Sequence, residues 1–197
     1  MNKQELFWQG EFGTNYHKRN RTTDRRMFWG EVLASRCAHI KSVLEPGAGK
    51  GENLIALRSM LGCKNGLIGV EVNPNACNVM RDNGLDVIES NFLGCWPCRV
   101  FDLVLTRGFL IHVPLDDLDN TLHRIYFAAS RYICFVEYFS VERREISYRG
   151  NAEALWSDDF AARIMRLHPD LFLVKYGFRY HTEGGDDLTY FLMEKKT

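Results

Sequence analysis

The sequence predicts an α/β fold, a doubly wound and mostly parallel seven-stranded sheet with a C-terminal antiparallel hairpin. Two observations predict it. Short apolar runs alternate with helix-like segments between residues 42 and 167, as in a parallel sheet with helices on both faces. The last two apolar runs, 171–180 and 188–195, are joined only by the Gly-containing segment 181–187, which favours an antiparallel pair.

The elements follow in chain order. Asn73 and Pro74 are typical of a helix start, because Asn caps free backbone N–H groups and Pro fits the first turn. Asn83 and Gly84 end that helix. The other predicted helices cover 22–38, a segment from about 51, 115–129 and 158–167. The predicted strands before the hairpin cover 42–45, 67–72, 86–89, 101–106 and 132–138, and residues 139–156 are expected to be irregular.

Length and charge limit the class of protein. The 197 residues suit one domain, 1–197, in which we expect 1–40 to form an N-terminal lid and helix and 139–156 to form a lid over the acceptor. The 25 Lys and Arg balance the 25 Asp and Glu without a basic tract, which argues against a nucleic-acid partner. No apolar run is long enough for a membrane span, and the start lacks an export signal. We therefore expect a cytoplasmic protein; the sequence indicates no oligomeric state.

The six cysteines are expected to be reduced thiols. Cys95-Trp96-Pro97-Cys98 has the spacing of a redox motif, but such a pair normally opens a helix, and here it precedes a strand. We predict a connecting loop. No ligand cluster with zinc spacing is present, so no metal is predicted.

A glycine-rich turn follows the first strand, with Gly47, Gly49 and Gly51 at alternate positions. A dinucleotide-binding turn needs a further glycine where this chain has Glu52. A phosphate-binding loop needs Ser or Thr after its lysine, and Lys50 is followed by Gly51. Neither pattern of phosphate recognition fits this turn.

Glu45, at the end of the first strand, would repel a pyrophosphate but suits a cationic ligand. S-adenosylmethionine carries a sulfonium and an ammonium group and no phosphate. The sequence therefore predicts S-adenosylmethionine as the cofactor, bound by Glu45, Gly47, Ala48 and Gly49. The alternative is an ordinary turn.

Further cofactor contacts are expected after the second and third strands. Glu71 ends the second strand, where an acid accepts hydrogen bonds from ribose hydroxyls; the alternative is a solvated charge at a strand end. Asn91 and Phe92 follow the third strand and are expected to bracket the adenine.

These motifs resemble those of class I S-adenosylmethionine-dependent methyltransferases. A closer resemblance, to the pseudaminic acid biosynthesis-associated methylases, runs through FWQGEFGTNYHKRN, FDLVLTRGFLIHVP, RYICFVEYFS, SYRG, YGFRYH and DDLTYFLMEK. It implies a Rossmann-like methyltransferase fold, methyl transfer, and a small-molecule acceptor such as a nonulosonic acid sugar. The CWPC loop departs from that family.

The acceptor is expected at the carboxyl ends of the fourth, fifth and sixth strands, which meet on the cofactor face. The candidate catalytic residues are His112, Glu137 and His181. Tyr16, Arg19 and Arg107 are expected beside the cofactor, with Tyr16 and Arg19 near its carboxylate or at the acceptor. The candidate acceptor-binding residues are Tyr138, Tyr148 and Arg149.

Two kinds of acceptor stay open. A hydroxyl must lose its proton, which calls for His112 or His181 as base, with Glu137 orienting base or acceptor. An acid group needs no base, and Arg107 or Arg149 would hold it. The rival functions are a protein-directed methyltransferase and a non-catalytic S-adenosylmethionine-binding module. The loop that methylates base amines, Asp/Asn-Pro-Pro-Tyr/Phe, is missing after the fourth strand.

Overall fold

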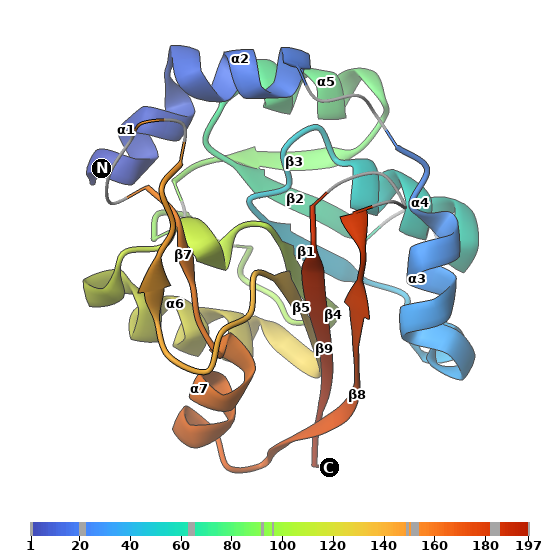
Figure 1. Cartoon of the computed structure of the whole chain (residues 1–197). Helices are drawn as coiled ribbons and strands as arrows, with labels where there is room; N and C mark the ends of the chain where they lie inside the picture. Colours follow the sequence, from blue (N-terminus) through green and yellow to red (C-terminus); the bar gives the residue numbers. More distant parts are fainter. Residues whose placement is uncertain are drawn as a thin grey trace.

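The computed structural model describes residues 2–19, 23–62, 66–91, 93–95, 97–148, 150, 154–181 and 186–196. Its centre is a seven-stranded sheet in the order β3-β2-β1-β4-β5-β9-β8 (Figure 1). The bounds are β1 Val43–Pro46, β2 Leu67–Glu71, β3 Asp86–Glu89, β4 Phe101–Arg107, β5 Ala129–Glu137, β8 Leu171–Arg179 and β9 Leu188–Lys195.

Strand pairing confirms the predicted doubly wound sheet with its terminal hairpin. The five strands β3, β2, β1, β4 and β5 are parallel, and β9 pairs antiparallel with both β5 and β8. The strand order reverses between β1 and β4, so the connections after these strands leave in opposite directions. This arrangement leaves a crevice beyond their carboxyl ends, where doubly wound folds bind ligands.

Helices cover both faces of the sheet and close two apolar cores. Helices α3 (Arg26–Leu33), α4 (Glu52–Leu61) and α5 (Pro74–Asp82) belong to one side, whose core includes Trp29, Leu57 and Met80. Helices α6 (Leu115–Ala128) and α7 (Phe160–Leu167) belong to the other side, on the left in Figure 1, whose core includes Leu118 and Ile164. Burial of these side chains supplies most of the driving force for folding.

The predicted helix 22–38 is shorter than expected. Helix α3 ends at Leu33, and a 3₁₀ helix, η1 (Ala34–His39), continues the segment. Ala34 has a φ of 44°, which an L-residue adopts at a cost, and the α-helical ladder is interrupted there.

The N-terminal residues form two helices that the sequence reasoning did not predict, α1 (Lys3–Gln9) and α2 (Glu11–Arg19). We call Lys3–Arg19 the N-terminal cap. Helix α1 begins with a reciprocal capping box, in which Asn2 and Glu5 accept each other's backbone N–H. The Asn73 side-chain amide donates to the carbonyl oxygen of Trp8 at 3.0 Å and so ties the cap to the start of α5. The cap lies at the upper edge of the sheet in Figure 1.

The described residues of segment 139–156, which was predicted to be irregular, include a short strand. This strand, β6 (Arg144–Glu145), pairs antiparallel with β7 (Trp156–Ser157). Cys95 and Cys98 are exposed free thiols in the connection between β3 and β4, as predicted for a loop. Within the described ranges, no helix has the length and apolar character that a membrane crossing requires.

Candidate functional site

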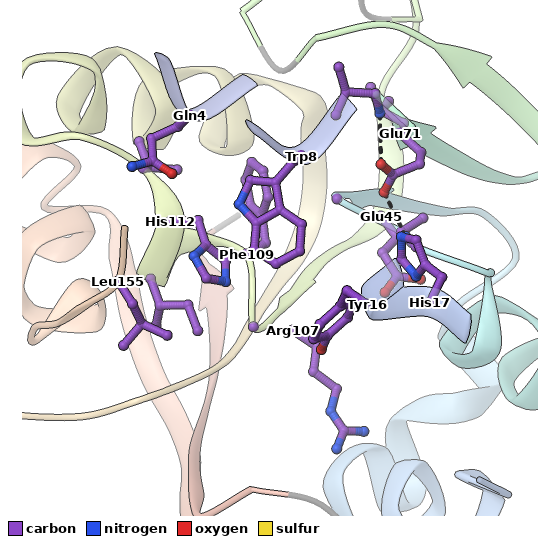
Figure 2. A pocket seen from close by; sticks show the side chains of 18 of the residues that line it. Gln4, Trp8, Tyr16, His17, Glu45, Glu71, Arg107, Phe109, His112 and Leu155 are labelled. Carbon is purple, nitrogen blue, oxygen red and sulfur yellow. Dashed lines mark hydrogen bonds between the residues drawn. The ribbon is translucent and has the colours of Figure 1, made fainter. Parts of the chain in front are cut away.

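A cavity of about 690 Å³ opens at the carboxyl ends of β1, β2 and β4, beneath the N-terminal cap (Figure 2). Its walls come from the turn after β1, the end of β2, the cap and the segment 107–114 after β4. Its size is in the range of small-molecule sites, and its place is the crevice that the strand order creates.

Gly47, Gly49 and Gly51, in the turn after β1, all adopt left-handed backbone conformations. Gly47 has a φ of 65°, and a Cβ there would stand 2.4 Å from Cδ2 of Phe109. Gly49 has a φ of 55°, and a Cβ there would meet the His17 ring at 3.2 Å. A side chain at either position would therefore strain the backbone and crowd the cavity wall.

Glu71 holds this turn in place from the neighbouring strand. Its Oε2 accepts the backbone N–H of Gly49 at 2.8 Å, and its Oε1 accepts the N–H groups of Val72 and Asn73 at 2.9 and 2.8 Å. A carboxylate has about four acceptor positions, so these bonds leave roughly one. Burial raises the pKa of Glu71, and the three backbone donors oppose that rise.

Glu45 is a nearly fully buried carboxylate, 1% exposed, on the cavity wall. Its Oε1 accepts the side-chain amide of Asn53 at 2.5 Å. Within the described part of the chain, Oε2 has no hydrogen-bond partner. Burial raises the pKa of Glu45 to about 8, although Asn53, Arg25 and Arg107 all favour the charged form. A buried carboxylate with an open oxygen is complementary to a cationic ligand.

The guanidinium groups of Arg25 and Arg107 lie close enough to Glu45 to favour its charged form. Arg25 pairs with Glu52 and donates to Asn53, but its Nε has no acceptor among the residues described. The Nη1 of Arg107 lacks an acceptor there as well. Burial and the nearby Arg25 and Arg179 lower the pKa of Arg107 to about 9. The open carboxylate oxygen and the open guanidinium donors together fit a zwitterion such as an amino acid.

The other end of the cavity is aromatic and apolar. It is lined by Trp8, Ile111, Val113, Tyr148 and Leu155, and Phe109 lies between these residues and Gly47. His112 adds a polar ring, and its Nδ1 lies 2.7 Å from the carbonyl oxygen of Ala154. Burial lowers the pKa of His112 to about 4, so the ring is neutral near pH 7.

Most of the predicted cofactor and acceptor residues line this one cavity. They are Tyr16, Arg19, Glu45, Gly47, Ala48, Gly49, Glu71, Arg107, His112, Tyr138 and Tyr148. Phe92 and Arg149 lie outside the described residues. Asn91 is not on the wall; its amide donates to Glu5 at 3.2 Å, and Ser90 and Leu93 line the cavity instead.

Two predicted catalytic residues, Glu137 and His181, are not on the cavity wall. The Glu137 side chain is buried away from the cavity, and its two oxygens accept the backbone N–H of Phe109 at 3.2 and 3.0 Å. It secures the start of the 3₁₀ helix η2 (Leu110–His112). His181 is exposed, and its ring lies 3.0 Å from Asp187 rather than in the cavity.

The sequence reasoning missed several wall residues, notably Gln4, Trp8, His17, Arg25 and Asn53. The first three belong to the N-terminal cap. The spacing of Asn2 and Glu5 in the sequence indicates the start of a helix. In such a helix Gln4 and Trp8, four residues apart, lie on the same face. Among the described residues, no three His, Cys, Asp or Glu side chains gather as metal ligands.

Comparison with known proteins supports the fold. No protein-family model matches this chain, and no curated protein matches its sequence. The 1,6-didemethyltoxoflavin-N1-methyltransferase of Burkholderia thailandensis, solved with S-adenosylhomocysteine and 1,6-didemethyltoxoflavin, is similar with a TM-score of 0.73 and 15% identity over 100% of this chain and 92% of the other.

Two further structures are similar. Magnesium protoporphyrin IX methyltransferase of Synechocystis, solved with S-adenosylmethionine, gives a TM-score of 0.68 at 11% identity, over 100% of this chain and 99% of the other. A sugar N-methyltransferase of Streptoalloteichus gives 0.68 at 12% identity, over 96% of this chain and 94% of the other. The chain therefore has the class I methyltransferase fold. None of these comparisons shows the pseudaminic acid-associated family.

Proposed function

We propose that the chain transfers a methyl group from S-adenosylmethionine to a small-molecule acceptor. The observation that carries the proposal is the unbonded Oε2 of buried Glu45, together with the unbonded donors Nη1 of Arg107 and Nε of Arg25. Glu71 lies on β2, the strand next to the one that carries Glu45. These groups are complementary to a ligand that contains both an amino-acid moiety and a ribose, as S-adenosylmethionine does. The similar structures solved with S-adenosylmethionine or S-adenosylhomocysteine support the proposal.

Each part of the cofactor has a matching group on the wall. Glu45 would accept from the ammonium group, and Arg107 and Arg25 would donate to the carboxylate. Glu71 would use its remaining acceptor position for a ribose hydroxyl. The glycines at 47 and 49 would let the ligand approach the backbone closely. When bound, the cofactor supplies an electrophilic methyl group on a sulfonium.

We propose a sugar, such as a nonulosonic acid, as the acceptor. Trp8 and Tyr148 offer aromatic faces for the ring, and Arg19 supplies a positive charge at the wall for a carboxylate. The cap encloses the site between Trp8 and the strand ends, which favours a small acceptor over a folded protein. The similar structure whose own substrate is described as a sugar adds support.

The experiment is to mix purified protein with methyl-labelled S-adenosylmethionine and a panel of sugars, small acids and proteins. We expect a labelled small molecule, with sugars as the best acceptors. Glu45→Gln should lose transfer, and the exposed control Glu142→Gln should keep it. Label on proteins alone would favour a protein-directed enzyme, and cofactor binding without transfer to any acceptor would favour a non-catalytic binding module.

A further inference from the structure

Trp8 presents a buried hydrogen-bond donor to the apolar end of the cavity. Its indole Nε1 is shielded from solvent and has no acceptor within the described residues. The indole ring lies 4.5 Å from the His112 ring, centroid to centroid, at an interplanar angle of 59°. Figure 2 shows the indole nitrogen on the side of Trp8 that faces Gln4 and His112.

His112 presents the matching acceptor. Because a carbonyl oxygen only accepts, the 2.7 Å contact with Ala154 requires the proton to be on Nδ1 of His112. Nε2 of the neutral ring then carries a lone pair. The low pKa of His112 keeps this tautomer free of a second proton near pH 7. The two rings are adjacent, yet Nε1 of Trp8 does not bond to His112, so the Trp8 donor is open to a third partner beside the His112 ring.

We infer that Trp8 and His112 form a subsite for a neutral hydroxyl group of the acceptor, so that the product is a methyl ether. This inference rests on the proposed function and goes further, since it selects the acceptor atom. A hydroxyl donates its O–H to Nε2 of His112 and accepts Nε1–H of Trp8 with one lone pair. Its second lone pair remains for attack on the methyl carbon.

Other nucleophiles match this pair less well. A carboxylate only accepts, so it would face the lone pair of His112 without a proton to share. A neutral amine has a single lone pair, which it would have to divide between Trp8 and the methyl carbon. The N–H donor of Trp8 beside the lone pair of His112 therefore favours O-methylation of a hydroxyl over methylation of an acid or an amine.

The reaction balances with these two residues. The hydroxyl oxygen forms a bond to the methyl carbon as the carbon–sulfur bond breaks, and the electron pair of that bond goes to sulfur, which becomes a neutral thioether. The hydroxyl proton passes to Nε2 of His112, which becomes an imidazolium. Loss of this proton to water restores the neutral ring.

The test identifies the type of atom that is methylated, whichever molecule is the acceptor. The protein is incubated with carbon-13 and radiolabelled methyl cofactor and a deproteinised small-molecule extract of cells, and labelled products are treated with mild alkali. We expect label that alkali does not release and a methyl carbon shift of an ether. Release as methanol would identify an ester, and a shift typical of N-methyl would identify an amine; either result overturns the inference while methyl transfer stands.

Absence of any labelled product would count against the proposed function and the inference together. Binding of S-adenosylhomocysteine, measured by calorimetry, then tells whether the cofactor site itself fails.

Variants add a second readout. Trp8→Phe keeps an aromatic ring, although a smaller one, and removes the donor, and it should lower kcat/KM by roughly 3- to 10-fold. His112→Phe should lower kcat by about 10²- to 10⁴-fold. Both should keep the affinity for S-adenosylhomocysteine, which also reports correct folding. The exposed control His39→Gln should change neither quantity. Unchanged turnover in both Trp8→Phe and His112→Phe would contradict the subsite.

Discussion

The carboxylate of Glu71 accepts the backbone N–H of Gly49 at 2.8 Å, so the end of β2 holds the turn that follows β1. Both residues line the cavity, and Glu71 is also bound to the backbone at Val72 and Asn73. One buried side chain therefore sets the shape of the turn and offers the acceptor that we assign to the ribose.

Glu71→Ala should weaken binding of S-adenosylhomocysteine by about 2–4 kcal/mol, because a charge-assisted bond to the ribose and the support of the turn are both lost. Isothermal calorimetry measures the difference, and we expect micromolar affinity for the wild type. The control is Glu89→Ala, which removes an exposed acid at the end of the next strand, paired with Arg81. Full affinity in Glu71→Ala would contradict the assignment.

Glu45 should couple cofactor binding to proton release. In the folded chain its pKa is raised to about 8 by burial, so the carboxyl group is protonated below that pH. The unfolded chain loses this proton near pH ~4.3, so this group makes the fold less stable as pH rises from about 4 to about 8. A bound ammonium group favours the ionised form, so binding expels the proton.

Calorimetry in two buffers of different ionisation enthalpy detects this release. We expect about one proton to be released per ligand near pH ~6.5, and affinity that rises as the pH approaches about 8. Glu45→Gln should abolish the release along with most of the affinity. Equal apparent enthalpies in both buffers for the wild type would show that Glu45 is not the partner of the ammonium group.

Glu137→Gln should act on stability rather than on cofactor binding. Backbone N–H groups of Phe109, Leu110 and Ile111 all bond to this carboxylate, so the single oxygen of a glutamine would leave its N–H donor against one of them, which costs about 1–3 kcal/mol in free energy of unfolding. Chemical denaturation measures the loss, and calorimetry should find unchanged affinity for S-adenosylhomocysteine. Unchanged stability combined with loss of turnover would instead support the direct catalytic role predicted from the sequence.

Replacement of Cys95 and Cys98 by Ser should leave the protein almost unchanged. Both thiols are exposed and free in a connecting loop, and surface substitutions usually change stability by no more than about 0.5 kcal/mol. Thermal unfolding and cofactor affinity are the readouts. A metal bound to the purified protein, or a large drop in melting temperature, would show that the pair has a structural or redox role.

The sheet and its ligand-binding edge were readable from the sequence because both depend on local patterns. Apolar runs separated by helical segments set the parallel strands, and the alternating glycines after Glu45 marked the turn. Glu71 was placed correctly because the end of β2 follows directly from the length of its apolar run.

The chemistry of single side chains was less readable. Trp8 reaches the cavity because residues far away in the sequence, such as Asn73 and Asn91, anchor the N-terminal cap. Glu137 ends a strand beside the site, as predicted, yet its side chain turns to the amide of Phe109 on the neighbouring connection. Such contacts arise from tertiary packing, which strand and helix patterns do not encode.

The most direct test of the central claim is a crystal structure of the chain with S-adenosylhomocysteine. The account predicts the ammonium group at Glu45, the carboxylate at Arg107 or Arg25, a ribose hydroxyl at Glu71, and the sulfur facing Trp8 and His112. A ligand bound outside this cavity, or a sulfur that faces an open flat surface instead of those two rings, would contradict it.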